Sequence, residues 1–137
     1  MTPEKVLYTA KVHTTGNRDG GTSRSSDGLL DIHHALPGSG KGTNPEQLFA
    51  AGWSACFDGA MNIAARRMEV KLPAERAIDA EIDLCLTGED YFLQARLNVS
   101  LPGLDHDTAR AVIEAAHQTC PYSKATRGNV QITLNLV

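Results

Sequence analysis

The segment from Thr43 to Met68 constrains the fold of this chain more than any other. It begins with "TNPEQ", in which Asn44 can cap a helix and Pro45 suits the first helical position. Beyond this start, nearly all the polar residues fall in one narrow stripe at helical spacing: Gln47, Ser54, Asp58, Asn62 and Arg66. Most of the remaining side chains are apolar or small. The sequence therefore predicts a long helix that lies buried at the centre of the fold.

Segments before and after this helix alternate in the manner of β-strands. Residues 5–13, "KVLYTAKVH", and 29–36, "LLDIHHAL", predict two strands that are separated by a polar loop over residues 14–28. Residues 76–87, "RAIDAEIDLCLT", and 91–101, "YFLQARLNVSL", predict an antiparallel hairpin.

A second helix is expected over about residues 107–119, and a last strand over 129–137. The second helix should end before Pro121, which cannot easily continue it. The resulting order, β-β-α-β-β-α-β, indicates an α+β fold rather than a doubly wound one. The length of 137 residues indicates one domain over residues 1–137.

Composition excludes several classes of function. The net charge is −3 and no basic patch occurs, which argues against nucleic acid as a partner. No apolar run approaches the roughly 20 residues that span a bilayer, so no membrane is expected as a partner. The polar N-terminus does not resemble a signal peptide, so a cytoplasmic location is expected. In that reducing compartment, any pairing among the three cysteines should be catalytic or redox-sensing.

The cysteines differ in their sequence surroundings. Cys56, in "GWSACFDGAM", lies opposite the polar stripe of the long helix and should be buried or interfacial. Cys120 extends the apolar face of the second helix, so the two thiols could meet inside one core. Cys85 should face solvent between acidic neighbours, as an incidental surface thiol. The plain alternative is that Cys56 is an inert core residue, as most free cysteines are.

Three charged residues accompany the thiols. Arg18, in "TGNRDGG", stands between glycines that would let the backbone fold inward and carry a guanidinium to a thiolate. Glu46 suits the first turn of the long helix, and it could also hold an arginine. Asp58 in so apolar a helix suggests a polar pocket there. No metal site is expected, because the histidines lack helical i,i+4 spacing and no CxxC motif occurs.

Two long segments resemble a known family. "TNPEQLFAAGWSACFDGAM" and "TCPYSKATRGNV" are similar to the signature segments of organic hydroperoxide resistance (Ohr) proteins, within the Ohr/OsmC superfamily. "GNRDG" and "SSDGLLDI" resemble the N-terminal segment of that family. The resemblance implies antiparallel sheets wrapped around long central helices. It also implies an intertwined homodimer with its active sites at the subunit interface.

The resemblance further implies a thiol-dependent peroxidase that reduces organic hydroperoxides to alcohols in the response to oxidative stress. By this likeness Cys56 is the peroxidatic cysteine and Cys120 the resolving cysteine, and the two form a disulfide. Arg18 matches the activating arginine, and Glu46 matches the glutamate that pairs with it. No cofactor is expected to be bound. The reductant implied is an external dihydrolipoyl dithiol on a lipoylated protein.

Apolar side chains on the helix that bears Cys56 can explain a preference for alkyl, aryl or fatty-acid hydroperoxides. Hydrogen peroxide offers no apolar surface to bury against them. The residues expected to line the substrate pocket are Leu48, Phe49, Trp53, Phe57 and Met61.

The spacing of Glu46 and Cys56 poses a geometric problem. Ten residues of straight helix separate them by about 15 Å along the axis and about 80° around it. Either the partner chain supplies the glutamate of each site, or the helix is broken near Gly52.

Two other classes of function compete with the peroxidase. The chain could be a lipid-binding or redox-sensing module in which the cysteines report oxidation without turnover. It could also be a structural dimer with inert thiols.

Overall fold

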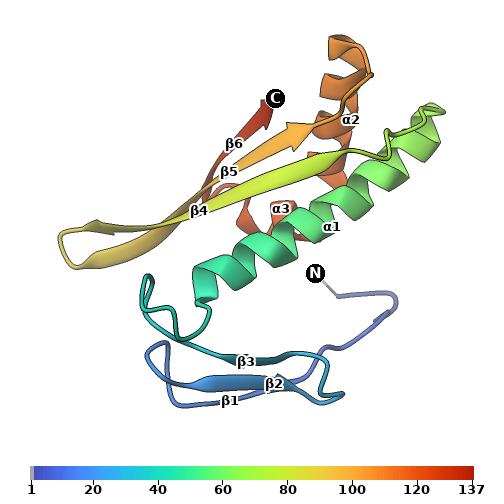
Figure 1. Cartoon of the computed structure of the whole chain (residues 1–137). Helices are drawn as coiled ribbons and strands as arrows, with labels where there is room; N and C mark the ends of the chain where they lie inside the picture. The colour runs from blue at the N-terminus through green and yellow to red at the C-terminus, as the bar shows by residue number, and fades with distance from the viewer. Residues whose placement is uncertain (1) are drawn as a thin grey trace. The chain divides into compact units, whose positions relative to one another are not determined.

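The computed structural model describes residues 2–137 and divides the chain into two compact units, Met1–Pro45 and Glu46–Val137 (Figure 1). The first unit holds a small sheet, and the second holds the long helix, the hairpin and the C-terminal elements. The expectation of one domain over residues 1–137 stays a prediction.

The first unit is a three-stranded antiparallel sheet in the order β1-β2-β3. Its strands are β1 (Val12–Thr15), β2 (Thr22–Ser25) and β3 (Asp31–His33). The prediction of a strand over residues 5–11 is wrong, and β2 lies inside the segment expected to be a loop. The sequence "TSRS" of β2 carries no apolar alternation. Backbone pairing with β1 and β3 holds this strand. Two hydroxyl pairs link it further to β1, with 2.7 Å between the Thr14 and Ser23 oxygens and 3.2 Å between those of Thr15 and Thr22.

The second unit packs helices on a sheet in the order β4-β5-β6. The predicted long helix is confirmed as α1 (Pro45–Met68), and the predicted hairpin as β4 (Ala77–Thr87) and β5 (Asp90–Ser100). The remaining elements are α2 (His106–Thr119), α3 (Pro121–Thr126) and β6 (Gln131–Leu136). β6 runs parallel to β5, and the chain from β5 to β6 passes through α2 and α3, as a parallel pair requires.

The short helix α3 was not predicted. Pro121 does end α2, but a proline also suits the first position of a new helix, and α3 begins there. Cys120 consequently stands between two helices. Its N–H donates to the carbonyl of Ala116, and its own carbonyl accepts from the N–H of Lys124.

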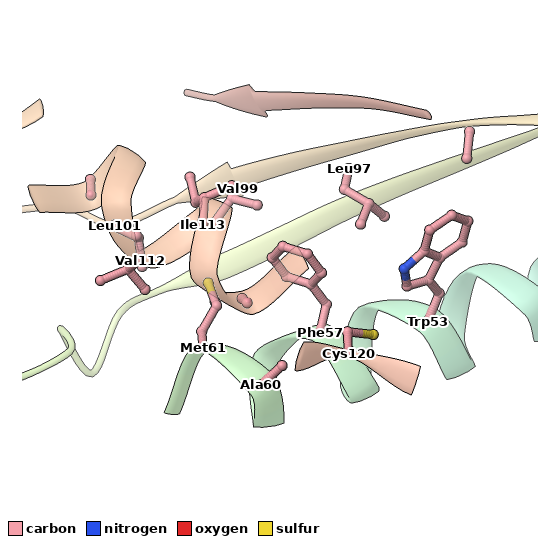
Figure 2. Close-up of a cluster of buried hydrophobic side chains, with 13 residues drawn as sticks. Trp53, Phe57, Ala60, Met61, Leu97, Val99, Leu101, Val112, Ile113 and Cys120 are labelled. Carbon is pink, nitrogen blue, oxygen red and sulfur yellow. The ribbon is translucent and has the colours of Figure 1, made fainter. Parts of the chain in front are cut away.

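One apolar core joins the helices to the sheet (Figure 2). Trp53, Phe57 and Met61 project from α1 toward β5 and are fully buried. The core residues from β5, the segment after it and α2 include Leu97, Val99, Leu101, Val112 and Ile113. The apolar face of the hairpin packs against this core at its central residues, such as Ile82 and Leu97. Leu84 and Leu86, nearer the turn of the hairpin, are about half exposed.

The opposite face of α1 carries small and apolar residues that are exposed. Ala51, Ala55, Gly59 and Ile63 recur at four-residue spacing and are exposed. The prediction that this helix lies buried at the centre of the fold is therefore met on one face only.

The outer face of the hairpin carries a polar network. Arg96 donates two hydrogen bonds of 2.8 Å to the Asp83 carboxylate and one of 3.0 Å to Glu81. Gln94 donates to Asp83, and Asn98 donates to Glu81. Each of these bonds crosses from β5 to β4, so the network favours the observed register of the two strands. The Arg96 guanidinium, helped by Gln94, holds the pKa of Asp83 well below its usual range.

A carboxyl group whose folded-state pKa is lowered stabilises the fold above its unfolded pKa, about 3.9 for Asp, and loses that effect as the pH falls. We expect Asp83→Asn to unfold at lower urea concentration than wild type at pH 7. It should also lose less stability between pH 5 and pH 2. The matched control is Asp79→Asn, on the same face of β4, which leaves the hydrogen bonds between Arg96 and Asp83 in place. Urea midpoints measured across this range test the prediction, and equal slopes for both variants would refute it.

Candidate active site

The structure brings Cys56 and Cys120 together. Cys56 lies near the middle of α1, and Cys120 lies between α2 and α3, 64 residues further along the chain. Their sulfur atoms are 3.5 Å apart, and both cysteines are free thiols. A disulfide requires a separation of about 2.05 Å, so a small movement of either side chain would join them.

The two thiols differ in exposure. Cys120 is fully buried among core residues, whereas Cys56 is only partly buried. Caps at the end of α2 and the start of α3 fix the backbone around Cys120. A molecule from solvent can therefore reach Cys56 more easily than Cys120. This difference suits Cys56 as the thiol that attacks a substrate and Cys120 as a second thiol that reacts afterwards.

The immediate surroundings of Cys56 oppose its ionisation. Burial raises the pKa of the Cys56 thiol, and the neighbouring Cys120 thiol raises it further. A hydrogen bond from the backbone of Tyr122 acts in the opposite direction and lowers the pKa. Since only the thiolate is a strong nucleophile, a positive charge or further hydrogen bonds at the sulfur would favour a reactive Cys56.

An aromatic cluster joins α3 to α1 beside Cys56. Tyr122 lies so close to Gly52 that an added Cβ would stand 2.9 Å from its hydroxyl oxygen. The Phe49 ring is 5.7 Å from that of Trp53 and 6.1 Å, edge-on, from that of Tyr122. The Trp53 indole N–H donates to the Ser123 hydroxyl at 3.3 Å.

Sequence reasoning missed Tyr122 and Ser123. A buried tryptophan normally requires a hydrogen-bond acceptor, so Trp53 signalled that a partner exists. Nothing in the sequence showed that this partner lies 70 residues away.

The five residues expected to line a substrate pocket fall into two groups. Trp53, Phe57 and Met61 are fully buried and pack in the core. Leu48 and Phe49, about two helical turns before Cys56, are partly exposed. What each contributes to a pocket stays a prediction.

Asp58 does not mark a polar pocket. Its carboxylate accepts two hydrogen bonds from Arg76, with Nε–Oδ2 and Nη2–Oδ1 distances of 2.9 and 3.1 Å. Arg76 also donates to the carbonyl of Pro73. Asp58 therefore ties α1 to the segment that leads into β4, which explains a charged residue in so apolar a helix.

Arg18 and Glu46 belong to different parts of the chain. Arg18 belongs to the turn between β1 and β2, and Glu46 to the first turn of α1. Because α1 is continuous from Pro45 to Met68, the alternative that the helix is broken near Gly52 is wrong. A glutamate from the partner chain remains the open alternative, since Glu46 and Cys56 stay about 15 Å apart along one helix axis.

Cys85 lies on the outer face of β4, with its sulfur 3.9 Å from the Asp83 carbonyl oxygen. Among residues 2–137, no group of three or more His, Cys, Asp or Glu side chains is placed to hold a metal ion. No helix in the same range is long and apolar enough to cross a membrane.

Comparisons with known proteins place this geometry in a family. Residues 38–135 match the family described as OsmC-like protein. The organic hydroperoxide resistance protein of Xanthomonas axonopodis pv. citri is 45% identical over 98% of this chain and 97% of its own length. The protein OhrB of Bacillus subtilis is 42% identical, over 96% of this chain and 98% of its own.

The crystal structure of Bacillus subtilis OhrB superposes with a TM-score of 0.90 and 39% sequence identity, covering 96% of this chain and 100% of that one. The chain belongs to the OsmC-like family. Within this Ohr/OsmC superfamily it is similar in both sequence and fold to proteins named for organic hydroperoxide resistance.

The contact between the two sulfurs predicts selective oxidation. With a mild thiol oxidant under native conditions, the chain should lose two of its three free thiols and form a Cys56–Cys120 disulfide. Thiol counting and mass spectrometry of peptides measure this outcome. Cys85→Ser should show the same loss of two thiols. Oxidation of Cys85 before the other pair would contradict the prediction.

Proposed function

We propose that this protein is a thiol-dependent peroxidase that reduces organic hydroperoxides to the corresponding alcohols. The observation that carries the proposal is the partly exposed Cys56 sulfur, 3.5 Å from the buried sulfur of Cys120. Support comes also from the relatives, which are named for organic hydroperoxide resistance.

The first step oxidises Cys56. Its thiolate attacks the distal oxygen of R–O–O–H, the S–O bond forms and the O–O bond breaks. The alkoxide leaves and takes a proton to become the alcohol, while Cys56 becomes a sulfenic acid. Electrophilic stabilisation of the leaving oxygen would lower the barrier of this step.

The second step uses Cys120. Its sulfur attacks the sulfenic sulfur of Cys56, the S–S bond forms, and the hydroxyl leaves as water. The 3.5 Å between the sulfurs favours this condensation over a second peroxide attack, because the nucleophile is already in place. Overoxidation to sulfinic acid is thereby avoided.

A dithiol from outside the protein restores the two thiols. No cofactor needs to be bound for this step, and the proposed donor is a dihydrolipoyl group on a lipoylated protein. Its thiolate attacks one sulfur of the disulfide, and its second thiol then completes the exchange. Because Cys56 is the more exposed of the pair, the mixed disulfide should form on Cys56 and release Cys120.

Arg18 is proposed to supply the charge that Cys56 requires. Burial raises the pKa of Cys56, and a guanidinium near the sulfur would reverse that direction. The same cation would stabilise negative charge on the peroxide oxygens. Glu46 is proposed to hold this arginine in the site of the partner subunit, which agrees with the continuous α1 helix.

The proposed assembly is an intertwined homodimer in the cytoplasm. The exposed face of α1 formed by Ala51, Ala55 and Gly59 would allow close approach of another helix. In the first unit, Val6, Leu7 and Tyr8 are also exposed apolar residues. A single chain leaves these surfaces in water, whereas a second copy would bury them.

Apolar hydroperoxides with alkyl, aryl or fatty-acid groups are the proposed substrates. Leu48 and Phe49 are partly exposed on the helix of Cys56, and fully buried Trp53 packs directly against Phe49. Burial of an alkyl or aryl group there contributes about 25 cal/mol for each Å² removed from water. Hydrogen peroxide gains nothing from such a surface.

Turnover of cumene hydroperoxide with dihydrolipoamide tests the proposal. Wild type should consume many equivalents and prefer cumene hydroperoxide to hydrogen peroxide, and Cys56→Ser should abolish consumption. Cys85→Ser is the matched cysteine control and should keep full activity. One stoichiometric oxidation without turnover would replace the peroxidase by a redox sensor, and absence of any reaction would indicate inert thiols.

The role of Arg18 has a separate test. Arg18→Ala should move the pH dependence of Cys56 alkylation to higher pH, because the thiolate loses its counter-charge. If the pKa of Cys56 rises by one, the alkylation rate should fall by about tenfold at every pH well below that pKa. Arg24→Ala, in the strand that follows the same turn, is the control. An unchanged profile in Arg18→Ala would remove Arg18 from the proposed machinery.

A further inference from the structure

A chain of hydrogen-bonded side chains runs through the first unit. The Thr14 and Ser23 hydroxyl oxygens are 2.7 Å apart, and the Ser23 hydroxyl lies 2.6 Å from Nε2 of His34. These two hydrogen bonds connect β1, β2 and the residue that follows β3. Ser23 and His34 are 6% and 8% exposed, so the His34 end of the chain is shielded from water.

The backbone of His34 holds the turn that carries Arg18. The Gly20 N–H donates to the His34 carbonyl, and the His34 N–H donates to the Gly21 carbonyl, both at 2.8 Å. The turn is closed on itself by a bond of the same length from the Gly21 N–H to the Asn17 carbonyl. Two backbone hydrogen bonds to His34 therefore hold the C-terminal end of the loop that contains Arg18.

This turn has little freedom to adopt another shape. A Cβ added at Gly21 would stand 2.4 Å from the Asn17 carbonyl oxygen, so the two backbones are already in close contact. Gly16, at the start of the turn, has φ +76°, a conformation that favours glycine. The direction in which the Arg18 side chain leaves the backbone thus depends on where His34 is held.

Among residues 2–137, Ser23 is the hydrogen-bond partner of the His34 ring. Within the same range the buried Nδ1 atom has no partner, so the bond between Nε2 and Ser23 holds the ring. A buried N–H without an acceptor costs more than a buried nitrogen lone pair without a donor. The proton of the neutral His34 ring is therefore placed on Nε2, and the unpartnered Nδ1 carries the lone pair. In that arrangement Nε2–H donates to Ser23, and Ser23 donates to Thr14. The bond ties the end of β3 to β2, the strand that begins one residue after the turn.

We propose that His34, through its bond to Ser23, is a positioning residue for Arg18. The inference rests on the proposed function, in which Arg18 activates Cys56. Without the side-chain bond, only the backbone contacts would hold residue 34 against β2. The Arg18 turn would then sample several positions, and the guanidinium would spend less time where the thiolate requires it.

The test is the pH profile of Cys56 alkylation in His34→Ala and in Ser23→Ala, which remove the bond from either side. Both should move the profile in the same direction as Arg18→Ala and slow alkylation at pH 7 by several-fold. The rate should recover at high pH, where the thiol ionises unaided. His34→Gln, whose amide N–H₂ can donate to Ser23, should restore most of the wild-type profile. His33→Ala, at the exposed neighbouring residue, should leave the profile unchanged.

Combination with Arg18→Ala separates positioning from a general loss of structure. If His34 acts through Arg18, His34→Ala should not displace the profile of an Arg18→Ala protein any further. A further displacement in the double variant, or wild-type profiles in Ser23→Ala and His34→Ala, would overturn the inference. If His34→Ala fails to fold, the other two variants still test the inference. Ser23→Ala should move the profile, and His34→Gln should keep most of the wild-type profile. Failure of Arg18→Ala itself to move the profile would instead refute the proposed role of Arg18.

Discussion

The second unit depends on the burial of one face of α1 against β5. Trp53, Phe57 and Met61 are fully removed from water on that face, and each adds roughly 1.5 to 3 kcal/mol or more of favourable transfer free energy. This packing fixes the rotation of α1 about its axis, and therefore the direction of Cys56. The same core places α2, and with it Cys120, so the thiol contact is a direct consequence of core packing.

Core packing and thiol reactivity act in opposite directions at this site. The apolar surroundings that bring the sulfurs to 3.5 Å also raise the pKa of Cys56. Core packing alone therefore places the thiols well but disfavours the ionisation of Cys56. A positive charge from another segment would favour the thiolate, which is the role proposed for Arg18. In this proposal, the packing that positions Cys56 and the residue that activates it belong to different units of the chain.

The sequence predicted best the elements with strong apolar periodicity. The α1 helix and the β4–β5 hairpin follow from their patterns, because each buries one regular face. β2 was missed because hydroxyl pairs such as Thr14–Ser23 replace apolar ones, and no period reveals them. The segment 5–11 alternates but forms no strand, since alternation identifies a face and does not supply a neighbouring strand. At the site, the two thiols were predictable from their positions on apolar helix faces and from the likeness to a family. The contacts of Tyr122 and Ser123 were not, because they depend on packing between segments far apart in the sequence.

Different forces hold the two parts of the proposed chemistry. The thiols are placed by apolar packing, which is non-directional and tolerates small changes of shape. The Arg18 turn is placed by short, directional bonds among Ser23, His34 and Gly20 in a unit with few buried apolar residues. Loss of one such bond would change the orientation of the turn rather than the volume of a packed core. The arginine should therefore be the more sensitive element of the site, since a small rotation of its turn moves a guanidinium at the end of a long side chain.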